Sequence, residues 1–116
     1  MNIKSSKNLT CVDLYSGIGG WALGFKLCNI KISQSFEWWT QASLTHDLNL
    51  STSTTQGDIR KLLPSKIKKP VDFIVGSPPC TQFSYSNRGG SGDISDGLKD
   101  IKKFFELVEY IKPKYW

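Results

Sequence analysis

The sequence predicts an α/β fold in which a parallel sheet carries helices on its faces. Two observations predict it: short apolar runs typical of strands alternate with helix-like segments, and a glycine-rich turn joins the first strand to the first helix. Strands that alternate with helices at this pitch form parallel sheets. The 116 residues are enough for one modest domain with a core and too few for two, and no repeat or linker divides them.

The first half of the chain is predicted to contain two strands, each followed by a helix. The spacing of apolar residues distinguishes the two types, because strands favour short apolar or alternating runs and helices a period near 3.6. The predicted elements are a strand in LTCVDLY (9–15), a helix in WALGFKLC (21–28), a strand in KISQSFEWW (31–39) and a helix in TQASLTHDLNL (40–50).

The second half is predicted to add two strands and a long amphipathic helix. A short strand is expected near residues 54–57 and a buried one in VDFIV (71–75). The segment 96–112 is expected to be a helix that ends before Pro113, after which residues 114–116 start another strand. The predicted apolar face of this helix is Leu98, Ile101, Phe104, Phe105, Val108 and Ile111.

Composition is that of an ordinary globular protein, with 39% hydrophobic and 12% aromatic residues. No apolar run is long enough to span a membrane, and MNIKSSKN has no apolar core typical of a secretory signal. We therefore expect a cytoplasmic protein. Fifteen basic against ten acidic residues give a net charge of +5, a bias that favours a polyanionic partner. The basic clusters at 60–70 and 99–103 are expected to be solvated faces or, less often, phosphate contacts.

The three cysteines have no CxxC spacing, which argues against a disulfide framework and a zinc site. Cys11 and Cys28 are expected to be packing residues. His46 is expected at the surface or at a helix end, since metal partners are lacking. No metal site is predicted.

Cys80 stands apart because GSPPCTQFS (76–84) places it after two prolines at the end of a strand. Pro78 and Pro79 fix their own φ and restrict the preceding residues, so the backbone before the thiol is stiff. The carboxyl ends of parallel strands form the usual ligand crevice, which suits a nucleophile. A buried, inert cysteine is the alternative from this stretch alone.

The glycine turn in DLYSGIGG (13–20) has the features of a nucleoside site, because small residues let backbone N–H groups approach a ligand. Glu37 follows Gly17 by twenty residues, where an acid that binds ribose hydroxyls belongs. Tyr15 and Trp38 could sandwich an adenine, and Asp58 could accept from its amino group. Each also has a plain alternative as a cap, a turn residue or a core aromatic. The turn matches GxGxxG only loosely, which argues against a nicotinamide enzyme.

In their order and approximate spacing, DLYSGIGG, FEWW, GDI and GSPPCTQFS resemble the cytosine carbon-5 DNA methyltransferase family, from Leu9 to Trp116. Amino-group methyltransferases are similar in their sheet but have an acid or asparagine, two prolines and an aromatic where this chain has its cysteine. The resemblance implies a Rossmann-like fold that depends on S-adenosyl-L-methionine, here with an incomplete parallel sheet and flanking helices.

The resemblance also implies roles for individual residues. Cys80 would attack carbon 6 of a flipped cytosine in DNA, and Pro79 would shape the pocket beside the base. The thiol needs a lowered pKa, which a basic, partly exposed site favours. The glycine-containing loop after Cys80 would be a lid, with Ser84 and Arg88 as DNA contacts. The implied cofactor-binding residues are Tyr15, Ser16, Gly17, Gly19, Gly20, Glu37, Trp38, Asp58, Ile59 and Pro78.

The family's glutamate-asparagine-valine motif, target-recognition region and carboxyl-terminal helix are not found in these 116 residues. We therefore expect residues 1–116 to be the N-terminal part of a single catalytic domain, inactive alone and completed by a complementary C-terminal chain. Two alternatives stay open: a fragment that binds S-adenosylmethionine without productive chemistry, and a transfer RNA cytosine-5 methyltransferase. The absence of a proline soon after Cys80 favours DNA over RNA.

Overall fold

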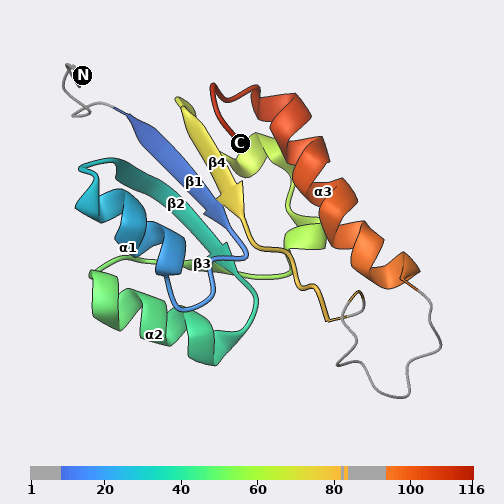
Figure 1. Cartoon of the computed structure of the whole chain (residues 1–116), viewed down its shortest axis with the longest axis horizontal. Coiled ribbons are helices and arrows are strands. Elements are labelled where there is room, and N and C mark those ends of the chain that lie inside the picture. The colour runs from blue at the N-terminus through green and yellow to red at the C-terminus, as the bar shows by residue number, and fades with distance from the viewer. Residues whose placement is uncertain (1–8, 82, 84–93) are drawn as a thin grey trace.

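The computed structural model describes residues 9–81, 83 and 94–116, which form a four-stranded parallel sheet with helices on both faces (Figure 1). The strands are β1 (Thr10–Leu14), β2 (Lys31–Glu37), β3 (Thr55–Gln56) and β4 (Phe73–Gly76), and they lie in the order β3-β2-β1-β4. The predicted α/β class and its parallel pairings are confirmed.

The helices α1 (Gly20–Leu27) and α2 (Thr40–Leu50) lie on one side of the sheet, and α3 (Ser95–Ile111) lies on the other (Figure 1). Two short 3₁₀ helices, η2 (Ile59–Lys61) and η3 (Pro64–Lys66), connect β3 to β4. This arrangement follows from the right-handed crossovers of parallel sheets. It brings the carboxyl ends of all four strands to one edge, where the predicted site residues lie.

The main core fills the space between the sheet and α3. Its buried members are Val12, Leu14, Phe36, Ile59, Ile67, Ile74, Leu107 and Ile111. The helix contributes Leu107, which is fully buried. Burial of one such side chain contributes roughly 1.5–3 kcal/mol.

The buried face of α3 differs from the predicted one. Phe105, expected in the core, is 47% exposed, and Leu107, which we did not predict, lies on the buried face together with Asp100. The prediction of Phe105 is therefore wrong. The physical reason is that Asp100 is buried against the charged Arg60. The true buried face of α3 is therefore rotated about the helix axis relative to the face inferred from apolar residues alone.

Two further predictions about single residues are wrong. Cys28 is exposed, because it caps the end of α1 instead of lying on its buried face, whereas Cys11 is buried in β1 as predicted. His46 is fully buried, not at the surface. Its Nδ1 lies 2.9 Å from the Thr52 hydroxyl, which gives the buried ring a polar partner in the segment that follows α2.

The last residues join the sheet as predicted. Tyr115 forms a parallel bridge with Phe73, and the N–H groups of Lys114 and Tyr115 both donate to the carbonyl of Asp72. The Tyr115 and Phe73 rings stack with centroids 4.8 Å apart. The side chain of Lys114 adds an ion pair to Asp72 at 2.8 Å. Among the described residues, no helix is both long and apolar enough to cross a membrane.

Candidate cofactor pocket and nucleophile loop

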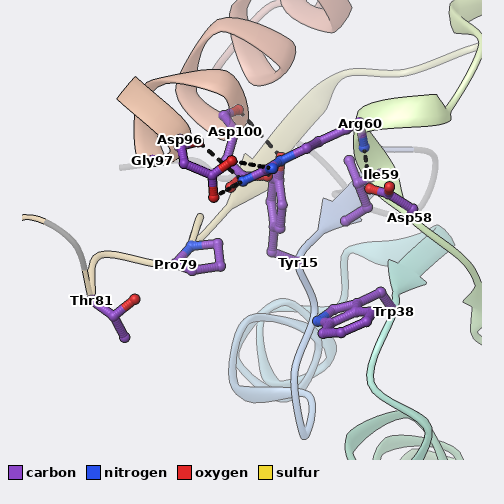
Figure 2. A pocket seen from close by; sticks show the side chains of 10 residues that line it. All are labelled: Tyr15, Trp38, Asp58, Ile59, Arg60, Pro79, Thr81, Asp96, Gly97 and Asp100. Carbon is purple, nitrogen blue, oxygen red and sulfur yellow. Dashed lines mark hydrogen bonds and ion pairs between the residues drawn. The ribbon is translucent and has the colours of Figure 1, made fainter. Parts of the chain in front are cut away.

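The carboxyl ends of the strands surround a cavity of about 280 Å³ (Figure 2). This volume is near the lower end of small-molecule pockets, roughly 300–1,000 Å³. Its walls come from the segments that follow β1, β2, β3 and β4 and from the first turns of α3. The lining residues are Tyr15, Trp38, Asp58, Ile59, Arg60, Pro79, Thr81, Asp96, Gly97 and Asp100.

The glycine turn begins directly after β1 and depends on glycine at one position in particular. Gly19 has φ +99°, and a Cβ there would lie 2.5 Å from Leu50 Cδ1 and 3.0 Å from His46 Cδ2. Glycine is therefore required both by backbone conformation and by the close approach of α2. His46, which is buried in α2, and Leu50 make this close approach to Gly19, and the sequence pattern did not indicate it.

Glu37 joins the glycine turn to the end of β2. Its Oε2 accepts from the Gly17 N–H at 2.8 Å, and its Oε1 accepts from the N–H groups of Trp38 and Trp39 at 3.0 and 2.9 Å. The residue is only 8% exposed. The carboxylate thus fixes the turn and the start of the Trp38 wall relative to each other.

Asp13 lies near the carboxyl end of β1, fully buried, and neither of its oxygens accepts a hydrogen bond from the described residues. Burial, and secondarily the charge of Glu37, raises the pKa of Asp13 to about 7. A carboxyl group in this position favours its protonated form, because ionisation in a low-dielectric interior is costly.

Asp58 and Ile59 occupy the segment between β3 and η2. Asp58 Oδ1 accepts from the Arg60 N–H at 3.0 Å and so caps η2, while Ile59 is 4% exposed and belongs to both the core and the pocket. The cap uses only Oδ1, so Asp58, which lines the pocket, keeps a second carboxylate oxygen for other contacts.

Arg60 connects this segment to α3. Its Nε donates to Asp100 Oδ1 at 3.0 Å, its Nη2 donates to Asp100 Oδ2 at 2.6 Å, and its Nη1 donates to Asp96 Oδ1 at 2.9 Å. The hydrogen bonds to Asp100, and then those to Asp96, raise the pKa of Arg60. Although the Arg60 side chain is 33% exposed, its guanidinium is paired with two carboxylates of α3, so it is neither simply solvated nor placed as a phosphate contact. Asp96, Arg60 and Asp100 were all missed as site residues, because no local pattern joins positions 36 and 40 residues apart.

The loop that carries Cys80, the candidate nucleophile, follows β4 and is more exposed than the rest of the site. Pro79 and Thr81 line the pocket, whereas Cys80 between them is exposed and is not among the lining residues. The Trp21 indole N–H donates to the Ser77 hydroxyl at 3.0 Å and so links α1 to this loop. Burial raises the pKa of the thiol of Cys11, in β1, to about 12, which makes Cys11 unsuitable as a nucleophile at neutral pH.

The described residues contain no cluster of three or more side chains able to hold a metal ion. A model of the family "C-5 cytosine-specific DNA methylase" matches residues 9–116. The chain belongs to that family.

Several methylases of the Type II class are similar to this chain. M.HindV of Haemophilus influenzae is 40% identical over 112 residues, which cover 93% of this chain and 36% of that protein. M.DdeI of Desulfomicrobium norvegicum is 31% identical over 112 residues, covering 93% and 26%. The chain therefore spans about a third or less of the length of these curated relatives.

Solved structures agree with the methylase family in fold. A crystal structure described as a DNA modification methyltransferase encoded within an E. coli prophage matches with a TM-score of 0.74 and 28% identity, over 91% of this chain and 30% of that one. The S. pombe Dnmt2 methyltransferase matches with a TM-score of 0.68 at 20% identity, over 90% and 30%, and shows the fold alone. The Rossmann-like methyltransferase fold predicted from the sequence is confirmed.

The methylase motifs predicted from the sequence come together at one edge of the sheet, although not all of them line the pocket. Five predicted residues do so: Tyr15, Trp38, Asp58, Ile59 and Pro79. Ser16, Gly17, Gly19, Gly20 and Glu37 form or support the adjacent turn, and Pro78 precedes the lining part of the loop. Ser84 and Arg88 lie outside the described residues.

Proposed function

We propose that residues 1–116 are the N-terminal part of a DNA cytosine-5 methyltransferase catalytic domain, the part that binds S-adenosyl-L-methionine and carries the nucleophile. One observation carries the proposal: a chain that matches the methylase family along 9–116 gathers Tyr15, Trp38, Asp58 and Ile59 around a single pocket beside the cysteine loop. DNA as the substrate is supported by the family.

The residues present fit the adenosyl part of the cofactor. Tyr15 and Trp38 offer aromatic faces to an adenine ring, and Trp38 is 68% exposed and so accessible to a ligand. Asp58 has an oxygen beyond the one used by its cap, and Ile59 supplies an apolar wall. Glu37 already accepts three N–H groups and has limited remaining capacity for a ribose hydroxyl.

The methionine part of the cofactor would meet the turn rather than the pocket walls. We assign this role to the backbone of Ser16, Gly17, Gly19 and Gly20, because α1 begins at Gly20 and its first N–H groups favour an anionic carboxylate. Pro78 would contact the cofactor from the loop after β4.

When bound, the cofactor supplies an electrophilic methyl group for carbon 5 of cytosine. Cys80 makes that carbon reactive: its thiolate forms an S–C6 bond to the flipped base, and the C5=C6 electron pair moves to carbon 5. When carbon 5 has reacted and lost its proton, the S–C6 bond breaks and the thiolate is released. Pro79 keeps the loop stiff and shapes the pocket beside the base. Ser84 and Arg88 stay as proposed DNA contacts.

We expect these 116 residues to bind cofactor with little or no turnover when tested alone. The acid that would contact cytosine ring nitrogen 3 and the region that would read bases in the groove are not among them. A chain that carries those motifs would supply the missing half of the site, with DNA as the shared substrate. In that combined enzyme, competition between DNA and transfer RNA tests the choice of substrate.

Calorimetric titration of S-adenosylmethionine into the purified chain tests the proposal. Saturable binding is expected, and Asp58→Asn should weaken it about tenfold, because the amide keeps the cap on Arg60 but removes a charge-assisted bond of roughly 1.5 kcal/mol. Glu109→Gln, an exposed change on α3, is the matched control and should leave the affinity unchanged. A folded chain that produces no binding heat would contradict the proposal.

A further inference from the structure

One wall of the pocket comes from α3 and is acidic. Asp96, Gly97 and Asp100 line the cavity from the first turns of this helix, next to Tyr15 (Figure 2). Asp100 is 6% exposed. A buried carboxylate needs a charged or hydrogen-bonded partner, because removing it from water is otherwise costly.

Arg60 is that partner, and its geometry fixes how Asp100 lies. The guanidinium binds both oxygens of Asp100 through Nε and Nη2, and it reaches Asp96 with Nη1. A two-point contact between a planar guanidinium and a carboxylate specifies orientation as well as distance. Asp100 therefore has little freedom to turn.

Tyr15 is attached to the same carboxylate. Its hydroxyl donates to Asp100 Oδ1 at 3.1 Å and lies 3.2 Å from the Asp100 carbonyl oxygen. Its backbone has φ +55°, a left-handed conformation that is uncommon for a tyrosine and persists where the surroundings determine it. The ring is thus held at both ends, by the turn at its backbone and by Asp100 at its hydroxyl.

We propose that Asp100, oriented by Arg60, is a positioning residue for the cofactor pocket: through the Tyr15 hydroxyl it holds the tyrosine ring as a preformed wall for the adenosyl group. This assignment rests on the proposed function. A wall that is ordered before binding removes the loss of side-chain freedom that a ligand would otherwise impose, which strengthens binding without any direct contact from Asp100.

The test uses S-adenosylhomocysteine, with its affinity measured by calorimetry and the thermal unfolding midpoint measured in parallel. Tyr15→Phe should weaken binding about three- to tenfold, which is the effect of one lost hydrogen bond, with little change in the midpoint because the Arg60–Asp100 ion pair remains. Tyr110→Phe, at an exposed tyrosine of α3, is the matched control and should leave the affinity unchanged.

Two variants of Asp100 separate positioning from simple stabilisation. Asp100→Asn keeps an oxygen that can accept from Tyr15, so it should lower the unfolding midpoint while retaining most of the affinity. Asp100→Ala should lower both. In the Asp100→Ala background, adding Tyr15→Phe should produce a smaller loss of affinity than in wild type, since the carboxylate is already gone and only the Asp100 carbonyl oxygen is left to accept from the hydroxyl.

Each result has a defined meaning. If wild type binds the ligand and Tyr15→Phe binds it equally well, the positioning assignment alone is overturned. A full additional loss of affinity on adding Tyr15→Phe to Asp100→Ala also overturns it, because the hydroxyl would then act without the Asp100 carboxylate. A folded wild-type chain that binds no ligand overturns the proposed function and the assignment with it.

Discussion

The pocket wall and the nucleophile loop lie side by side but are held very differently. In the wall, Glu37 accepts three backbone N–H groups, and Arg60 binds two carboxylates of α3. In the part of the loop that the structure describes, a hydrogen bond between exposed side chains, from Trp21 to Ser77, reaches the segment before Cys80, and Cys80 is itself exposed.

The difference suits the two tasks of the proposed group-transfer site. A binding wall gains from being ordered before the ligand arrives. A nucleophile must reach a base and withdraw from it, so its loop needs local stiffness, supplied here by Pro78 and Pro79, more than tight packing. We therefore expect substitutions that remove the buried supports of the wall to lower stability, and substitutions in the loop to leave stability nearly unchanged.

The largest expected effect is at Cys80. Cys80→Ala should abolish covalent adduct formation with DNA that contains 5-fluorocytosine, when the chain is combined with the complementary half, because no other residue supplies the attacking sulfur. The unfolding midpoint should not change, since the side chain is exposed. Mass spectrometry of the adduct and thermal unfolding check both parts, with Cys28→Ala as the control. An adduct that survives in Cys80→Ala would refute the assignment of the nucleophile.

The next effect concerns Asp13, beneath the pocket wall. Its pKa of about 7 when folded, against about 3.9 when unfolded, means that the folded state holds the proton more tightly. The free energy of unfolding contributed by this group is thus fully present below about pH 4, falls as the pH rises and is lost above about pH 7. The total change is on the order of 3–4 kcal/mol, as an upper limit.

Asp13→Asn should remove this dependence, because an amide does not titrate. Urea unfolding of both proteins at pH 5, 6, 7 and 8 should show a decline for wild type and a nearly flat profile for the variant. The pH dependence between pH 5 and 8 has no contribution from three other aspartates, because their pKa values are lowered and they stay ionised throughout this range: Asp47, Asp72 and Asp96. Parallel profiles for the two proteins would rule out the buried acid as the source.

A smaller effect is expected at Glu37. In Glu37→Gln one side-chain atom becomes an N–H donor, so at least one of the N–H groups of Gly17, Trp38 and Trp39 loses its acceptor. A buried donor without a partner lowers the free energy of unfolding by about 1–3 kcal/mol.

Cofactor affinity should fall together with stability in Glu37→Gln, because the turn and the Trp38 wall lose their common support. Chemical denaturation and calorimetry give the two values, and the exposed change Glu109→Gln is the control. A variant with normal stability but weakened binding would mean that Glu37 acts on the ligand and not on the wall.

The smallest effect is expected in the loop, at Ser77. Ser77→Ala removes the acceptor of the Trp21 indole N–H, a bond between exposed groups that contributes less than about 1 kcal/mol. Unfolding should be nearly unchanged, while the rate of Cys80 alkylation, measured in a Cys28→Ser background, should change by about twofold or less. The exposed Ser65→Ala serves as the control. A stability loss as large as that of Glu37→Gln would contradict the contrast between wall and loop.

Local sequence patterns were sufficient for most of the fold. The strands, the glycine turn and the helices were predicted within a few residues, because each depends on the spacing of apolar side chains and on glycine and proline rules that act over short distances. The same rules placed Tyr15, Trp38, Asp58 and Ile59 at strand ends, which is why they meet at one edge.

What the sequence could not supply were partners that are far apart along the chain. His46 and Cys28 were wrongly placed, one buried and the other exposed, because burial depends on how α1 and α2 pack. Asp100 was missed because a charged residue breaks an apolar helical pattern unless its counterion is known.

By itself the sequence determined the alternating architecture, the glycine-rich turn and the stiff proline-proline-cysteine loop, since each follows from the backbone preferences of adjacent residues. Only the tertiary structure decided that Arg60 meets Asp96 and Asp100 and that Tyr15 is anchored to this pair. The physical reason is that a buried charge is stable only where the folded chain places its opposite charge within hydrogen-bond distance, and no local pattern specifies that meeting.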